Sequence, residues 1–251
     1  MVEIAKRTGI SALLLMVLPL LLWASGWQWQ PENDYRWLKG WYWLTQTVTS
    51  PWGTLTSALL ISWFLWCLRY RLKPALGLVA ILTATLLIGQ GMKSFIKERA
   101  QEPRPYVLWL EKHYAIDDRA FYAMPRKARS AAVARELKEQ QVIPPWLQKH
   151  WRAATDFSFP SGHTIFAVSW ALLAVGLLWP RRYRFSTVVL MVWASGVMVS
   201  RMVLGMHWPR DVVVGVAVSW LVITLGCWLV QRWIGALTPM PEEAPDIRSR
   251  G

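Results

Sequence analysis

The side chains best suited to chemistry are gathered in three short segments that lie between long apolar runs. Residues 97–105 read Lys-Glu-Arg-Ala-Gln-Glu-Pro-Arg-Pro, residues 160–163 read Pro-Ser-Gly-His, and residues 200–211 read Ser-Arg-Met-Val-Leu-Gly-Met-His-Trp-Pro-Arg-Asp. Among these residues are two histidines, an aspartate, a lysine, arginines and a Ser-Gly pair that can open a helix. Such groups, once brought together, can hold a phosphate and cut its ester bond.

The third segment contains a candidate nucleophile. His207 and Asp211 are four residues apart, a spacing that puts them on one face if the segment is helical. A carboxylate bonded to one ring nitrogen fixes the tautomer and raises the basicity of the other nitrogen, which can then attack phosphorus. Asp211 directly precedes the apolar run 212–230, where a charge is costly and marks a functional site. The alternative is a structural ion pair with Arg210 or Arg201.

The second segment predicts an anion site and a general acid. A helix that starts at Pro-Ser-Gly-His offers unpaired backbone N–H groups and a partial positive charge. Ser161 adds a hydroxyl, and Gly162 lets the backbone approach a phosphate closely. A leaving alkoxide needs a proton, which the imidazole of His163 can donate near neutral pH. The alternative for His163 is a hydrogen-bonded structural role.

Three basic side chains complete the predicted phosphate cradle. The guanidinium groups of Arg104 and Arg201 match the oxygens of a phosphate, and Lys97 adds a point charge. Each could instead be a residue at the membrane edge that reaches toward the headgroups. The segments lack clustered carboxylates for Mg²⁺ and a Cys/His set for Zn²⁺, so we expect no metal and no cofactor. His113 and His150 are isolated, and we expect both at the surface.

Composition places the chain in the membrane. Its 251 residues are 54% hydrophobic and only 17% charged, and the mean hydropathy is +0.25. The net charge of +13 lies largely in short loops beside apolar runs, and no aromatic-and-basic pattern typical of nucleic-acid binding is found. Cys67 and Cys227 lie inside apolar runs, which favours small buried residues over a disulfide.

Apolar segments near the length of about 20 residues that crosses a bilayer predict an all-α fold, a bundle of six transmembrane helices in one domain, residues 1–251. They are residues 9–26, 52–68, 74–96, 161–179, 185–203 and 210–231. The first segment has an alternative interpretation as a signal peptide, with Lys6-Arg7 before it and Ala24-Ser25-Gly26 after it.

A tryptophan-rich loop, residues 27–50, follows the first segment. Indole rings favour the headgroup zone, so we expect this loop at the membrane surface. Its two basic residues are offset by Glu32 and Asp34. The tryptophans near it are Trp27, Trp29, Trp37, Trp41, Trp43 and Trp52.

The basic loops predict the orientation. Loops 69–73 and 181–184 are basic without an acid, and Lys6-Arg7 stands at the N-terminus, so both termini are predicted in the cytoplasm. The first segment follows the third span, the second opens the fourth, and the third joins the fifth to the sixth. All three therefore lie on the side opposite to the termini, which is the periplasm in a bacterium. Residues 98–159 form a charged, partly helical cap there. We expect its charges to be a solvated face, with a lid over the site as the alternative.

The spacing Lys-x6-Arg-Pro, Pro-Ser-Gly-His and Ser-Arg-x5-His-x3-Asp resembles the signature of the type 2 phosphatidic acid phosphatase family at every position that this family uses for chemistry. The resemblance covers nearly the whole chain. It implies six retained helices and a multi-pass lipid phosphatase of the bacterial inner membrane, with no obligate protein partner. Its candidate substrates are phosphatidylglycerophosphate, undecaprenyl diphosphate, phosphatidic acid, lysophosphatidic acid and diacylglycerol diphosphate, which implies roles in phospholipid metabolism and peptidoglycan precursor recycling.

The same residues also allow functions other than a lipid phosphatase. A membrane phosphotransferase would use the same phosphohistidine and another acceptor. A phosphatase for soluble esters fits the residues. A haloperoxidase with vanadate in the same cradle also fits them, but the apolar segments argue against it. A channel or transporter predicts charges in the middle of the spans, whereas the charges here lie at their ends.

Overall fold

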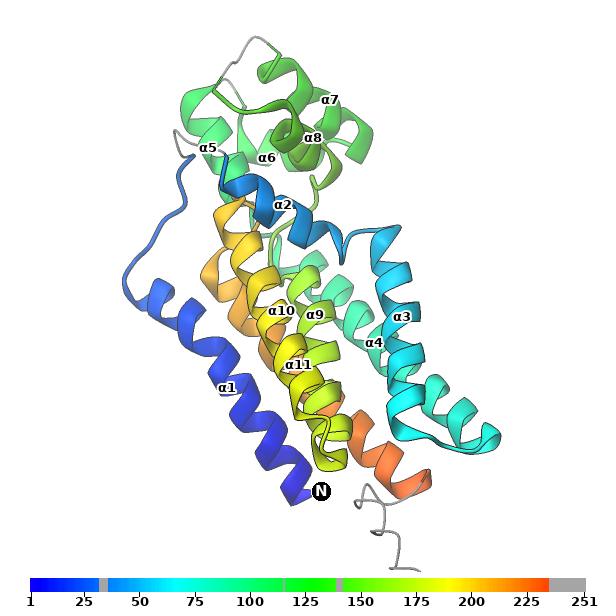
Figure 1. Ribbon diagram of the computed structural model, residues 1–251. Coiled ribbons are helices and arrows are strands. Elements are labelled where there is room, and N and C mark those ends of the chain that lie inside the picture. Colours follow the sequence, from blue (N-terminus) through cyan, green and yellow to red (C-terminus); the bar gives the residue numbers. More distant parts are fainter. Residues whose placement is uncertain (32–35, 115, 139–141, 235–251) are drawn as a thin grey trace, which may run out of the picture.

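The computed structural model describes residues 1–31, 36–114, 116–138 and 142–234 (Figure 1). Within these ranges every regular element is a helix, as predicted. Glu32 and Asp34, two acids of the tryptophan-rich loop, lie outside the described residues. So do Glu139 of the predicted cap helix and the C-terminal residues 235–251, for which a cytoplasmic location was predicted.

Each predicted apolar segment is a helix. Five helical stretches are long and apolar enough to cross a membrane, and α3, with 17 residues, is a shorter apolar helix. The six helices are α1 (Val2–Ala24), α3 (Trp52–Leu68), α4 (Leu72–Ala100), α9 (Gly162–Leu173), α10 (Arg184–Val203) and α11 (Pro209–Trp233). A π-helical turn (Ala174–Leu178) and a 3₁₀ turn (Trp179–Arg181) continue α9.

Helix α9 is the centre of the bundle. It packs against α4, α10 and α11, and all residues from Ala167 to Leu173 are buried. Helix α11 approaches it closely because Gly215 has no side chain: a Cβ there would stand 3.1 Å from Thr164. Ser219 of α11 donates to the Ile165 carbonyl at 3.1 Å. The start of α9, which carries Pro-Ser-Gly-His, is therefore held firmly by its neighbours.

The predicted cap is a small helical unit over one end of the bundle (Figure 1). It consists of α5 (Pro105–His113), α6 (Asp118–Ala123), α7 (Arg126–Glu136) and α8 (Pro145–Ala153). Helices α5 and α8 begin with proline, whose missing N–H costs nothing in the first turn. The cap has its own apolar cluster, in which Tyr106 stacks on Trp151 with ring centroids 4.9 Å apart.

The tryptophan-rich segment is not simply a surface loop, so that prediction was incomplete. Residues Leu38–Gln46 form helix α2, which packs on α10 beneath the cap (Figure 1). Trp29 is 8% exposed, and its indole donates to the Val203 carbonyl at 2.9 Å. Gly205, at φ +71°, makes room for this ring, because a Cβ there would lie 2.7 Å from it. The segment is thus part of the protein interior as well as its surface.

Topology can be tested with single cysteines. The N-terminus and the loop from α3 to α4 lie at the end of the bundle opposite to the cap (Figure 1). In a variant with alanine at the buried Cys67 and Cys227, the exposed positions Ala128 and Lys73 are changed to cysteine one at a time. We expect a membrane-impermeant maleimide to label Ala128→Cys in intact cells and Lys73→Cys only after lysis. The reverse pattern would place the cap in the cytoplasm.

Candidate active site

The three sequence motifs meet at the cap end of the bundle through backbone hydrogen bonds. The Ser158 N–H donates to the Glu102 carbonyl at 2.8 Å, which joins the chain before Pro-Ser-Gly-His to the first motif. The Ser161 N–H donates to the Asp211 carbonyl at 3.1 Å, which joins the second motif to the third. Segments that are far apart in the chain therefore form one continuous wall.

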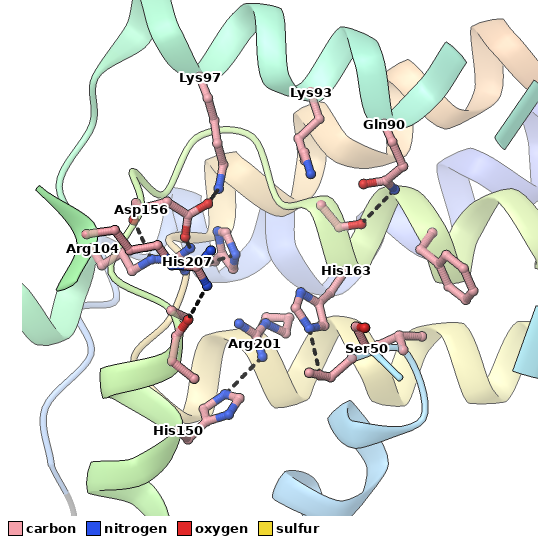
Figure 2. Close-up of a pocket in the computed structure, with 17 residues that line it drawn as sticks. Ser50, Gln90, Lys93, Lys97, Arg104, His150, Asp156, His163, Arg201 and His207 are labelled. Atoms are coloured by element: carbon pink, nitrogen blue, oxygen red, sulfur yellow. Dashed lines mark hydrogen bonds and ion pairs between the residues drawn. The ribbon is translucent and has the colours of Figure 1, made fainter. Parts of the chain in front are cut away.

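This wall encloses a cavity of about 450 Å³ (Figure 2). Two of the predicted residues, Asp211 and Ser161, are fully buried and lie outside the lining. Lys93 and Arg126 also line it, and the sequence analysis did not select them. The predicted residues in the lining are Lys97, Arg104, Gly162, His163, Arg201 and His207.

His207 and Asp211 are in contact, but not on one helical face as predicted. Helix α11 begins at Pro209, so His207 precedes it and Asp211 is its third residue. One carboxylate oxygen, Asp211 Oδ2, accepts from the Trp208 N–H at 3.0 Å and lies 3.3 Å from His207 Nδ1. A helix cap thus orients the imidazole. A proton on Nδ1 leaves a lone pair on Nε2, 3.3 Å from Arg104 Nη1.

His207 is a neutral imidazole in this setting. Burial, reinforced by the charges of Arg104 and Arg201, lowers its pKa well below the usual value near 6.5. Because only an unprotonated ring nitrogen can act as a nucleophile, this environment keeps His207 in the form that such a role requires at neutral pH.

Arg104 and Lys97 share a carboxylate that the sequence analysis missed. Arg104 is 3% exposed, and its Nε and Nη1 donate to the carbonyls of Asp156 and Met206, each at 2.7 Å. Its Nη2 donates to Asp156 Oδ1 at 2.5 Å, and Lys97 forms an ion pair with Asp156 Oδ2 (Figure 2). The available signal was the position of this acid, four residues before Pro160.

Asp156 is ionised. Burial by itself would raise its pKa, but the charges of Arg104 and Lys97 and their hydrogen bonds outweigh burial and hold the pKa well below the usual range. The carboxylate therefore provides two of the cavity cations with a counter-charge when no other anion is bound.

Arg201 is held by the cap and by α2. Its side chain is fully buried, and Nη1 donates to Thr45 Oγ1 at 2.9 Å and to His150 Nε2 at 3.1 Å. The prediction of His150 at the surface was wrong, because it lies on the buried face of α8 and meets Tyr42 edge to face. Burial and the charge of Arg201 lower the pKa of His150, which leaves its imidazole able to accept. His113 is exposed, as predicted.

The start of α9 carries His163. Its Nε2 lies 3.0 Å from Thr49 Oγ1, in the turn that follows α2. Ser161 is the N-cap, and its hydroxyl accepts from the Thr164 N–H at 3.3 Å and the Thr164 hydroxyl at 2.9 Å. The Ser161 side chain therefore caps the N-terminus of α9. Gly162 gives the cavity a backbone wall without a side chain.

An apolar groove of about 420 Å³ adjoins the cavity. It runs between α3 and α4, where side chains such as Ile61 and Leu87 line it. Val48, Ser50, Gln90 and Phe166 line both spaces. A molecule with a charged head and an apolar tail can therefore occupy both at once.

Comparison with known proteins identifies relatives of the whole chain. Residues 74–234 match the model of the PAP2 superfamily. The chain is 53% identical over 248 residues to phosphatidylglycerophosphatase B of Escherichia coli strain K12, covering 99% of this chain and 98% of that protein. It is 31% identical over 223 residues to phosphatidylglycerophosphatase B of Haemophilus influenzae, covering 86% of this chain and 92% of that protein.

Asp156→Asn tests whether this carboxylate competes with a bound anion. Arg104 keeps its two backbone carbonyl partners in this variant, whereas one negative charge next to the cavity is lost. Removing a repulsion of about 1 kcal/mol corresponds to roughly fivefold tighter binding of orthovanadate, measured by calorimetry in detergent. Glu102→Gln, which removes a partly buried acid paired with Arg210 and outside the cavity lining, should leave the affinity unchanged. Weaker vanadate binding by Asp156→Asn would mean that the carboxylate is needed to hold Lys97 and Arg104.

Proposed function

The chain belongs to the PAP2 superfamily and is a phosphatase, and we propose that it hydrolyses phosphate esters of membrane lipids through a phosphohistidine. The observation that carries this proposal is the buried His207–Asp211 pair beside a cavity lined by cations. His163 lines the same cavity from the start of α9, so that attack and leaving-group protonation can be divided between two imidazoles.

In the proposed first step, His207 Nε2 attacks phosphorus while Asp211 holds the proton on Nδ1. The bond from phosphorus to the ester oxygen breaks, and the imidazolium of His163 gives that oxygen a proton and becomes a neutral imidazole, so the lipid leaves as an alcohol. In the second step water attacks the phosphohistidine and gives its proton to His163. Inorganic phosphate leaves, and both histidines return to their starting states.

Charge stabilisation comes from the cavity wall. Arg104, Arg201 and Lys97 surround the space where the phosphoryl oxygens would lie, and the first turn of α9 adds backbone N–H groups. These donors can neutralise the charge that develops on phosphorus without a metal ion. In this proposal the phosphate takes the place that Asp156 occupies between Lys97 and Arg104.

The proposed substrates are lipids of the outer leaflet. Phosphatidylglycerophosphate comes first, because both relatives named above are phosphatidylglycerophosphatases. Undecaprenyl diphosphate, phosphatidic acid, lysophosphatidic acid and diacylglycerol diphosphate have the same combination of phosphate and apolar tail. The groove between α3 and α4 supports this substrate class, because it could hold the tail while the phosphate lies in the cavity. A phosphotransferase is the alternative, and release of inorganic phosphate from lipid alone separates the two.

The relatives and the apolar helices support a multi-pass protein of the inner membrane. We propose that both termini lie in the cytoplasm and that the cavity and the cap, residues 98–159, face the periplasm, as the basic loops predict.

Substitution of the nucleophile tests the mechanism. His207→Ala should lower kcat/KM for phosphatidylglycerophosphate by about 10⁴-fold or more, because the attacking atom is lost. Asp211→Asn should retain a trace of activity, because orientation is lost rather than the attacking atom. Purified variants are compared by phosphate release in excess EDTA, with the exposed His113→Ala as a control of unchanged activity. Phosphate release by His207→Ala at the wild-type rate would exclude a phosphohistidine at this residue.

Filling the groove tests where the lipid tail binds. Ser57 lines the groove, so Ser57→Trp should lower kcat/KM for long-chain phosphatidic acid by about tenfold or more. The same substitution should hardly change kcat/KM for glycerol phosphate, which is much lower in the wild type. Binding energy from the groove is available only to a substrate with a tail. Ala58→Trp, at the neighbouring exposed position, is the matched control. Equal losses for both substrates, or equal wild-type efficiencies, would favour a phosphatase for soluble esters.

A further inference from the structure

Helix α2 and the turn after it contact two reactive groups of the cavity through threonines four residues apart. Thr45 Oγ1 accepts from Arg201 Nη1 at 2.9 Å, and Thr49 Oγ1 lies 3.0 Å from His163 Nε2. Neither threonine belongs to the three motifs. We propose that Thr49 is a positioning residue that holds the proton of the general acid on His163 Nε2 and directs it toward the leaving group. This inference rests on the acid role of His163 in the proposed function.

Counting protons gives the direction of this hydrogen bond. A threonine hydroxyl has one proton to donate and two lone pairs that accept. Thr49 Oγ1 lies 3.0 Å from the Thr45 carbonyl, which can only accept, and so the hydroxyl proton is directed there. Thr49 Oγ1 then accepts from His163 Nε2–H. The chain from carbonyl through hydroxyl to imidazole therefore keeps an N–H on Nε2. The acid form of His163 is the imidazolium, which becomes a neutral imidazole when it donates this proton.

The position of this contact matches the path of a lipid. Thr49 lines the cavity, and its neighbours Val48 and Ser50 line both the cavity and the apolar groove. Figure 2 shows His163 beside Ser50, and His207 on the other side of the cavity with Arg104 and Asp156. In an in-line displacement the leaving oxygen is opposite to the attacking nitrogen. A leaving oxygen that carries a lipid tail would therefore approach from the groove side, where Thr49 accepts the hydrogen bond from His163 Nε2–H.

The bonds and protons balance with Thr49 as an acceptor only. When the lipid binds, its ester oxygen replaces Thr49 Oγ1 as the acceptor of the Nε2–H bond. The proton moves from Nε2 to this oxygen as its bond to phosphorus breaks. In the second step the attacking water returns a proton to Nε2, and the hydrogen bond to Thr49 forms again. The Thr49 hydroxyl keeps its own proton and donates a hydrogen bond to the Thr45 carbonyl throughout.

Removal of the Thr45 hydroxyl should have a different effect from removal of the Thr49 hydroxyl. Its hydroxyl acts on Arg201, a cation of the cradle, and the cradle serves every phosphoryl transfer whatever group leaves. Thr49 acts through the proton of the leaving group. Hydrolysis of an ester whose leaving group departs without a proton should therefore be unaffected by loss of the Thr49 hydroxyl and slowed by loss of the Thr45 hydroxyl.

The test compares two substrates in one detergent system by kcat/KM, which reports steps up to loss of the leaving group. Short-chain phosphatidic acid has an alkoxide leaving group that needs a proton, and p-nitrophenyl phosphate has one that does not. We expect Thr49→Val to lower the value for phosphatidic acid by about 30-fold, within the range of general acid catalysis, and that for p-nitrophenyl phosphate by less than about twofold. Thr49→Ser should restore activity, and Thr45→Val should lower both values alike.

Controls separate this inference from the function on which it rests. Thr56→Val removes a hydroxyl that holds the same turn at the Thr47 carbonyl but does not contact His163, so it should change neither value. His163→Ala should show the selective loss on phosphatidic acid. If it does and Thr49→Val, with Thr49→Ala as a smaller replacement, does not, the inference about Thr49 fails alone. If His163→Ala shows no selectivity, the acid assignment in the proposed function fails.

Discussion

Burial of cations at one end of an apolar bundle is the constraint on which the rest of this structure depends. A guanidinium group with 3% exposure, such as Arg104, or none, such as Arg201, is costly unless oxygens or lone pairs surround it. Arg104 obtains two backbone carbonyls and a carboxylate, and Arg201 obtains a hydroxyl and an imidazole. The partners come from α8 of the cap, from α2 and from the segments before α9 and α11, so these parts of the chain must all fold onto the site.

The same partners leave the cavity open to an anion. Asp156 is the one fully charged partner among them. In the proposed function a phosphate takes its place, while two backbone carbonyls continue to hold Arg104. The neutral His150 and Thr45 hold Arg201 without cancelling its charge. Both arginines of the cradle therefore have neutral partners that hold them without cancelling their charge, which leaves them electropositive for an incoming ligand.

The two candidate catalytic histidines, His163 and His207, are placed by helix ends rather than by helix faces. Asp211 caps α11 and contacts His207 in the turn before it, and His163 stands in the first turn of α9. Helix ends carry unpaired N–H groups, so the element that orients each imidazole also presents a partial positive charge to the cavity. The cap, through Arg126 and His150, and the turn after α2, through Thr49 and Ser50, line the cavity together with the bundle helices.

The sequence by itself determined the all-helical class, the positions of the apolar helices and the three motifs. These depend on local features: long apolar runs, and short spacings between residue types that hold wherever the chain folds. It could not determine that Asp156 pairs with Lys97, that His150 holds Arg201, or that Thr49 meets His163. These partners are 59, 51 and 114 residues apart, and no periodic pattern relates them. It also misjudged the link from His207 to Asp211, because the start of α11 at Pro209 makes it a cap contact. Only the tertiary structure decides such pairs, since they follow from which helix ends meet.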